Sequence, residues 1–353
     1  MLQIAHYAYL QTLVTIFSKQ LLDDKHFSSL IKQPLSEILT GLNHSGLENV
    51  IKELYQFHLK PLPAGNMDNL FLGVFLEDAQ SIIRSLSGVE RDFFIYWIRR
   101  FELQNIKTIL RGKSLLRPKE QIKAELTPLN HFSILPIDKM LNADTLTDIL
   151  ILLEETPFAS IARYGSKNFA QKRDVFTIET AINHQYFTGL NQQLEHLSND
   201  EQDLLQPLLG RIIDQTNLIW LLRYRLFYQL SSSHSYFLLV SGGLYLNSKV
   251  LMQLSKIKTL EQIYELIPDE INILIQGAES IYQIELKLEN DIIKLAGSLF
   301  KDKQFSLTHA FAYLLLREKQ LSQIHALLKG KLLDLPDSEI SFASAIESRA
   351  LGQ

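Results

Sequence analysis

The stretch Phe93–Lys113, FFIYWIRRFELQNIKTILRGK, decides the fold that this sequence predicts. Its apolar residues recur at the spacing of one helix face, and a single amide, Asn105, lies in the same apolar stripe. The stretch ends in Arg-Gly-Lys, which is typical of a helix terminus, because glycine accepts the left-handed cap and cations oppose the negative end of the helix dipole. We therefore expect a long amphipathic helix with one polar amide on its apolar face.

Two further copies of this phrase occur later in the chain. NLIWLLRYR begins at Asn217, and QIHALLKGK begins at Gln323. Each copy contains an amide, Leu or Ile, two variable residues, two aliphatic residues, and two bases separated by one residue. A second phrase, Leu-x-(Glu/Asp/Gln)-Ile, precedes each amide by a similar distance and begins at Leu35, Leu146 and Leu260. Two independent phrases that keep nearly the same offset indicate an internal repeat.

The repeat predicts an all-α chain of three homologous helical domains, at residues 1–113, 114–231 and 232–353. We expect about 70% helix and little or no sheet. The predicted elements include an opening helix over residues 5–31 and a continuous helix over residues 201–230. The segment Ser114–Lys119 and the polar run that begins at Ser231 are the predicted linkers.

The composition is that of an ordinary globular protein. Hydrophobic residues make up 46% and charged residues 21% of the 353 residues. The net charge of −4 argues against a nucleic-acid partner, because neutralising phosphates needs a basic excess. The sequence has no Cys, which removes disulfides, thiolate metal sites and Cys nucleophiles, and is compatible with a reducing compartment such as the cytoplasm.

The sequence shows no sign of a signal peptide or a membrane span. The N-terminal stretch from Met1 to Leu22 lacks a basic start and a small-residue cleavage site. The longest unbroken apolar runs, such as Ile149–Leu153 and Tyr236–Val240, are far shorter than the roughly 18–20 residues that a bilayer requires. We expect a chain that does not cross a membrane.

The sequence also lacks a catalytic or metal-binding motif. The ten His residues form no HExxH or other close ligand pair, and there is no GxSxG or GxGxxG motif. Gly41 and Gly46 have the spacing of a phosphate loop, but Leu47 and Glu48 replace its Lys and Ser/Thr. We expect no enzymatic activity, no metal, no cofactor and no small-molecule substrate.

The repeated amides allow two interpretations. A buried, unpaired amide costs about 1–3 kcal/mol, so Asn105, Asn217 and Gln323 should all have partners. Each amide could bond a neighbouring helix of its own unit and fix the packing. Alternatively, the three amides could face a shared central axis and contact something there.

The repeated bases are equally open. The two bases of each copy lie about 200° apart around a helix, so only one of them can face a common surface. They could simply complement the helix dipole, at about 0.3–1 kcal/mol each. Alternatively, they could form a ring of positive charge for an acidic partner.

RRFELQNIKTILRGK, NLIWLLRYR and REKQLSQIHALLKGK, repeated within an all-helical chain of this size, resemble the C subunit of V/A-type ATPases, the counterpart of the d subunit of eukaryotic vacuolar ATPases. The resemblance covers nearly the whole chain. The third copy departs from the family pattern, since Gln320 replaces an acid, Gln323 an Asn and His325 a base.

This resemblance implies a funnel of three similar helical domains around a pseudo-three-fold axis. It also implies a non-catalytic rotor subunit, a socket between the central stalk and the proteolipid ring that passes torque between ATP turnover and ion translocation. Its expected location is peripheral, on the cytoplasmic face of the membrane. Carried over position by position, the resemblance predicts these interface residues: Glu102, Asn105, Arg111, Asp214, Asn217, Arg223, Glu318 and Lys329.

A second function, from a different class, remains open. A soluble helical-repeat adaptor could bind a protein partner in its concave face without any link to a rotary motor. Association with membrane proteolipid and stalk subunits would distinguish the socket from the adaptor.

Overall fold

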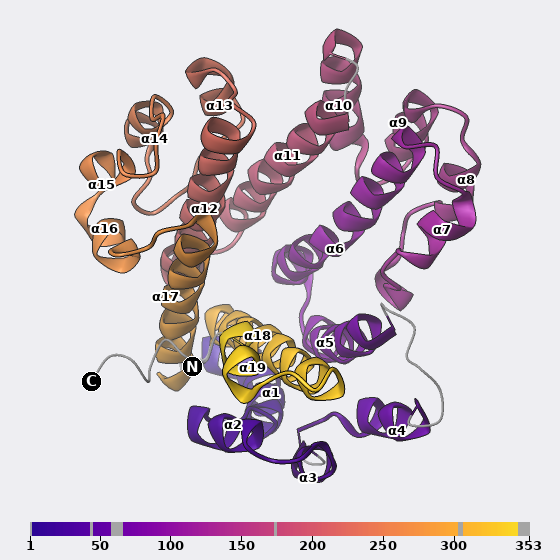
Figure 1. Cartoon of the computed structure of the whole chain (residues 1–353), viewed down its shortest axis with the longest axis vertical. Helices are drawn as coiled ribbons and strands as arrows, with labels where there is room; N and C mark the ends of the chain where they lie inside the picture. Colours follow the sequence, from indigo (N-terminus) through magenta and orange to yellow (C-terminus); the bar gives the residue numbers. More distant parts are fainter. Residues whose placement is uncertain (1, 43–44, 58–65, 173–174, 303–305, 345–353) are drawn as a thin grey trace. The chain divides into compact units, whose positions relative to one another are not determined.

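The all-α prediction is confirmed. The computed structural model describes residues 2–42, 45–57, 66–172, 175–302 and 306–344, is 77% helical, and has no strand among these residues (Figure 1). The chain forms two compact units. Unit 1 contains residues 1–87 and 293–353, and unit 2 contains residues 88–292. The predicted division into three domains at residues 113 and 231 stays a prediction.

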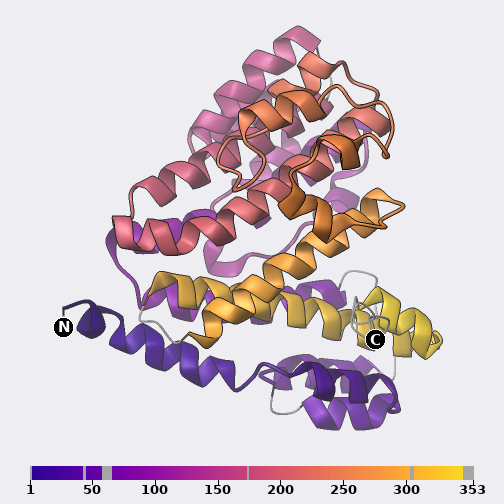
Figure 2. The same cartoon turned by 90° about the vertical axis from the view of Figure 1, so that its left-hand side faces the viewer.

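Unit 1 combines the two ends of the chain. Its central helix is α18 (Leu307–Leu332), in which every residue from Leu307 to Leu315 is buried. Such a helix, apolar around its whole circumference at one end, needs cover on all sides. This cover comes from α1 (Leu2–Ser18), α3 (Leu35–Gly41), α5 (Asn66–Arg84) and α19 (Asp337–Ala343), and unit 1 also contains α2 (Asp24–Ile31) and α4 (Glu48–Phe57) (Figures 1 and 2).

A buried ion pair joins α18 to α5. The Arg317 side chain is fully buried, and its Nε donates to Oδ2 of Asp78 over 2.9 Å. The same carboxylate oxygen accepts a hydrogen bond from the Tyr313 hydroxyl over 3.0 Å. Burial raises the pKa of the Asp78 carboxyl, although Arg317 and Tyr313 partly oppose that rise. Two helices more than 200 residues apart in the sequence are therefore joined by charge as well as by apolar packing.

Unit 2 contains two long helices that carry the repeated phrase, α6 (Gly88–Ser114) and α12 (Asn199–Leu222). Short helices and a second long helix follow each of them. After α6 come α7 (Lys119–Ala124), η2 (Asn130–Phe132), α8 (Ile137–Asn142), α9 (Leu146–Glu154), α10 (Ala159–Lys172) and α11 (Val175–Glu195). After α12 come η3 (Arg223–Phe227), α13 (Ser232–Phe237), α14 (Ser248–Leu254), α15 (Ile263–Leu266), α16 (Asp269–Ile275) and α17 (Ile281–Lys301), which continues into unit 1 beyond Ile292.

Helix capping explains several of these boundaries. Thr145 and Asp148 form a reciprocal capping box that starts α9, and the Asn247 side chain accepts two backbone N–H groups at the start of α14. The long helices also end alike. Leu116, Gln229 and Asp334 each adopt a positive φ of 51–53° shortly after their helix, which turns the chain sharply.

One of the three endings differs by a residue. Arg117 N–H donates to Gly112 C=O and Leu335 N–H to Gly330 C=O, whereas Leu230 N–H donates to Tyr224 C=O, one residue further back. In the repeated phrase, Tyr224 occupies the position of the two glycines. The predicted continuous helix over 201–230 is therefore wrong: α12 ends at Leu222, and a π-helical turn, η3, accommodates the extra residue.

The two glycines lie where a short helix crosses the long one. A Cβ on Gly112 would lie 2.5 Å from Cγ1 of Ile122 on α7, and a Cβ on Gly330 would lie 2.5 Å from Cγ1 of Ile340 on α19. Both isoleucines are fully buried. In these two copies, glycine thus lets the isoleucine of the next helix contact the backbone of the long helix.

Candidate functional site

The first two repeated amides each hold a segment of backbone. Asn105 Nδ2 donates to the carbonyl of Thr127, and the N–H of Thr127 donates back to Asn105 Oδ1, both over 2.8 Å. Asn217 makes the same pair of hydrogen bonds with Val240, both over 2.9 Å. Both amides are buried, and Asn217 is 0% exposed. Each amide therefore satisfies both the N–H and the C=O of one residue, as a neighbouring strand would, in a segment that has no regular secondary structure.

The third amide has a related but weaker contact. Gln323 Nε2 donates to the carbonyl of Ser344, just after α19, over 3.2 Å. The bonded carbonyls lie 22, 23 and 21 residues after their amides in the three copies. The partners are backbone groups of loop segments rather than neighbouring helices. As expected, all three amides have hydrogen-bond partners.

A carboxylate lies one helical turn before each of the first two amides. Glu102 Oε1 accepts the N–H of Ile134 over 2.9 Å, and the two Asp214 oxygens accept the N–H groups of Tyr245 and Leu246 over 2.8 and 3.0 Å. Both carboxyls are buried, and burial raises the pKa of each, partly offset by these backbone N–H groups. Each carboxylate thus fixes the segment that leads into the next short helix, α8 or α14.

In the third copy Gln320 takes the place of the carboxylate, and its partner comes from the other end of the chain. Its Oε1 accepts the N–H of Leu22 over 2.8 Å, and its Nε2 donates to the carbonyl of Gln20 over 2.9 Å. The segment it holds leads into α2, as those of Glu102 and Asp214 lead into α8 and α14. The sequence showed Gln320 only as a departure from the pattern, and its partners 298 and 300 residues away could not be inferred from spacing.

The repeated bases have separate tasks. The first bases, Arg111 and Arg223, form ion pairs with Glu179 and Glu285 respectively, and the Arg223 pair measures 3.0 Å. The second bases bond the short-helix region: Lys113 donates to the carbonyl of Ala143 over 2.7 Å, Arg225 to that of Ile257 over 3.1 Å, and Lys331 to Asp337 over 2.7 Å. Lys329 is exposed.

Glu318 lines a small hollow of 160 Å³ between α5 and α18 in unit 1. In the same hollow, His325 Nε2 lies 3.0 Å from Asp68 Oδ1. Burial lowers the pKa of His325, while Asp68 opposes that shift. Four of the eight predicted interface residues are buried and bonded within the chain: Glu102, Asn105, Asp214 and Asn217. The other four are exposed or partly exposed: Arg111, Arg223, Glu318 and Lys329. Their contact with a partner stays a prediction.

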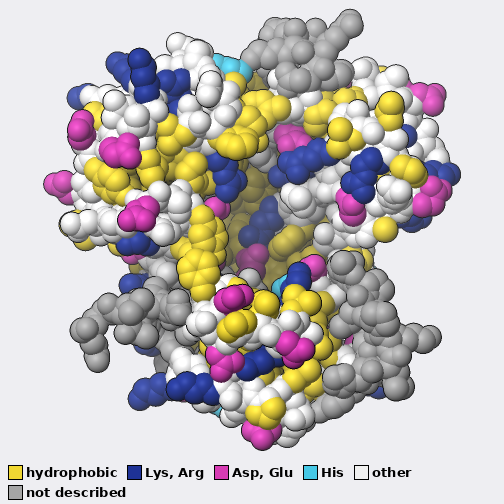
Figure 3. Space-filling view, viewed as in Figure 1, with side chains coloured by type: hydrophobic (Ala, Val, Ile, Leu, Met, Phe, Trp, Pro, Cys, Tyr) yellow, Lys and Arg dark blue, Asp and Glu magenta, His cyan; other side chains and the backbone are white. Residues whose placement is uncertain are grey.

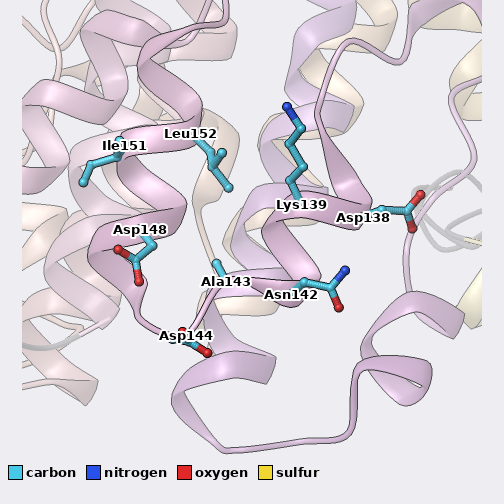
Figure 4. A pocket seen from close by; sticks show the side chains of 8 residues that line it. All are labelled: Asp138, Lys139, Asn142, Ala143, Asp144, Asp148, Ile151 and Leu152. Carbon is cyan, nitrogen blue, oxygen red and sulfur yellow. The ribbon is translucent and has the colours of Figure 1, made fainter.

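Another hollow, in unit 2, lies at α8 and α9 and has a volume of about 660 Å³. Asp138 there pairs with Lys123 over 2.9 Å, and Asp148 belongs to the capping box of α9. Figure 4 shows that Asp138, Lys139 and Asp144 point in different directions, so their charges do not converge on a point. Asp138 and Asp148 at this hollow thus take part in local contacts.

Within the described parts of the chain, no three His, Asp or Glu side chains are grouped so that they could hold a metal ion. The helices that the structure describes are all too short or too polar to span a bilayer. On the face shown in Figure 3, charged side chains of both signs are interspersed with hydrophobic ones.

Comparison with known proteins yields one consistent family. The family described as ATP synthase (C/AC39) subunit matches residues 10–342. The C subunit of the A-type ATP synthase of Methanocaldococcus jannaschii is 22% identical over 356 residues, covering 96% of this chain and 86% of the relative. That of Thermococcus kodakarensis is 24% identical and covers 92% of this chain and 86% of the relative. That of Methanosarcina acetivorans is 21% identical and covers 95% and 92%.

Proposed function

Because the chain belongs to the ATP synthase (C/AC39) subunit family, whose members are non-catalytic subunits of a rotary ATPase, we propose that it is the socket that joins the central stalk to the proteolipid ring. In this role it passes torque between ATP turnover and ion translocation. It lies peripherally on the cytoplasmic face of the membrane and contacts the bilayer only through the ring.

The observation that carries this proposal is a repeated set of side chain–backbone hydrogen bonds, made by an amide and by a second polar side chain one helical turn earlier. We call each such set a clamp. Three long helices, α6, α12 and α18, each hold two downstream or distant backbone segments through an amide and a second polar side chain one turn earlier. A part that transmits torque needs stiff, equivalent modules. Buried side chain–backbone bonds provide such stiffness, because breaking one leaves a polar group unpaired at about 1–3 kcal/mol.

The proposal also includes a funnel of three modules around a pseudo-three-fold axis. The hydrogen bonds of Gln320 change the boundary of the first predicted module. The module built on α18 takes the segment that leads into α2 from the start of the chain, so we place the first residues of the sequence with the last module.

The test is copurification from membranes solubilised in mild detergent. With an affinity tag on this chain, we expect the proteolipid and the central-stalk subunits at fixed stoichiometry. Recovery of a soluble protein partner with neither of them would contradict the socket and support a helical-repeat adaptor. A matched preparation, with the tag moved to the central stalk, is the control for loss of the complex in detergent.

A further inference from the structure

A second hollow in unit 2 has the features of a binding site for a partner's side chain. It lies between α6, α11, α12 and the start of α17, and its volume is about 320 Å³. Three of its lining residues are basic and one is acidic: Arg100, Lys107, Arg223 and Glu285. Of these four residues, the predicted interface includes only Arg223.

The wall of this α6–α12 hollow is aromatic and aliphatic. Phe187 and Trp220 meet edge to face with ring centroids 5.7 Å apart, and both remain partly exposed. Leu103 and Ile219 beside them are buried. An incoming apolar side chain would therefore bury the exposed parts of these two rings, which is favourable.

The charges of the hollow favour an anion. Glu285 is engaged by Arg223 over 3.0 Å, so the one acid is already paired with one of the three bases. Lys107 is half-buried, and its Nζ donates to a neutral acceptor, Oδ1 of Asn183, over 3.2 Å. Arg100 stacks over Trp97, with its guanidinium carbon 3.8 Å from the ring centroid. Burial lowers the pKa of Lys107, while the nearby Glu179 opposes that shift, and a further carboxylate beside Lys107 would raise this pKa.

We propose that the α6–α12 hollow binds a carboxylate side chain of the central stalk at Lys107, with an apolar side chain of the same segment against Trp220. This inference rests on the proposed socket function and supplies a point of contact for it. The ammonium group of Lys107, which donates to the neutral Asn183 side chain, provides the charge complementarity, and the neighbouring aromatic and aliphatic side chains reduce the access of water to the resulting ion pair.

The fluorescence of Trp220 can report binding at this hollow. It has only two tryptophans, Trp97 and Trp220, so in a Trp97→Phe variant the single indole lies in the hollow. We expect the emission of Trp220 to change when the full-length variant binds purified stalk subunits. Adding Lys107→Met should weaken that binding about tenfold or more, and Lys107→Arg should retain most of it. Lys139→Met, an exposed lysine of the same unit, is the matched control and should leave affinity unchanged.

The possible outcomes separate the two proposals. Stalk binding with unchanged Trp220 emission and unchanged affinity in Lys107→Met overturns the hollow but leaves the socket standing. No stalk binding by the parent chain overturns the socket and the hollow together. A Trp220 change of equal size with acetate or inorganic phosphate alone identifies a small-anion site and overturns the protein partner. Should Lys107→Met fail to fold by circular dichroism, Lys107→Gln, which removes the charge but keeps a polar side chain, tests the same contact with the same expected loss.

Discussion

Unit 2 and unit 1 both hold backbone segments through polar side chains of a long helix, but the side chains and the number of bonds differ. In unit 2 the clamps are an acid and an asparagine, Glu102 with Asn105 and Asp214 with Asn217, and each holds segments that follow within 32 residues. In unit 1 both positions are glutamine, and Gln320 reaches a segment 298 residues away. The local copies thus bury carboxylates, whereas the copy that joins the chain ends is neutral at both positions.

The difference shows that the repeated amide can hold its loop with either two hydrogen bonds or one. A short Asn side chain matches the backbone of a nearby loop with two bonds, while the longer, more flexible Gln323 makes one bond over 3.2 Å. Unit 1 has instead a buried charge of another kind, the Asp78–Arg317 pair between α5 and α18. We infer that the stability of unit 1 depends on this ion pair, as the stability of unit 2 depends on its buried amides.

The largest effect should come from breaking that pair. Arg317→Met leaves the Asp78 carboxylate buried without its cation, and we expect the free energy of unfolding to fall by about 3–5 kcal/mol. The double variant Arg317→Met with Asp78→Leu should recover most of the loss, because no charge is then left unpaired. Urea denaturation of the three proteins measures both effects. Equal stability of the single variant and the parent would show that unit 1 does not depend on the pair.

A smaller loss should follow from removing the amide of unit 2. Asn217→Leu orphans both the N–H and the C=O of Val240, and we expect a loss of about 2–4 kcal/mol in the free energy of unfolding. Gln323→Leu is the matched change in unit 1. It orphans one carbonyl rather than two backbone groups and removes a longer bond of 3.2 Å, so we expect a smaller loss of about 1 kcal/mol. If thermal denaturation gave equal losses, the two kinds of clamp would not differ as described.

The glycine contacts allow a comparison within the repeat itself. Gly112→Ala and Gly330→Ala each place a methyl group 2.5 Å from an isoleucine, and overpacking of this kind costs about 1–3 kcal/mol. The companion changes Ile122→Val and Ile340→Val remove only the outermost methyl group, so combined with the alanine they should relieve little of that strain. A pair of Gly→Ala variants with unchanged melting temperatures would mean that the short helices shift freely.

The smallest expected effect depends on pH. Burial raises the pKa of Glu102 above its ordinary value of 4.5, so the folded state binds more protons than the unfolded state just above that pH. Its contribution therefore lowers the free energy of unfolding as pH rises from 4.5 through the raised value. Glu102→Gln, which copies the neutral side chain of position 320, should make that decline shallower. Urea midpoints from pH 4.5 to 7 measure it, and a steeper decline in the variant would contradict this assignment.

Much of the fold could be predicted from the sequence. The repeated phrases predicted an all-α chain and three long helices with paired amides, because helical periodicity and the cost of an unpaired amide are both local properties. The opening helix predicted over residues 5–31 is wrong, since α1 ends at Ser18 and α2 begins at Asp24. The intervening segment is bound by Gln320, a long-range contact that no local pattern contains.

The candidate site was less predictable. Glu102 and Asp214 are among the predicted interface residues, yet both are buried. A carboxylate within a helix stripe can be satisfied by backbone N–H groups that only the folded loops bring close. Lys107 and Trp220 fall in variable positions of the repeated phrase, and no spacing singled them out. Their juxtaposition across α6 and α12 depends on the packing of the helices.

The position of this chain in the assembled ATPase tests the central claim most directly. An electron-microscopy map of the complete, detergent-solubilised complex should show one copy of the chain between the foot of the central stalk and the proteolipid ring, touching both. A map that places it elsewhere in the complex, or a complete complex without it, would contradict the socket.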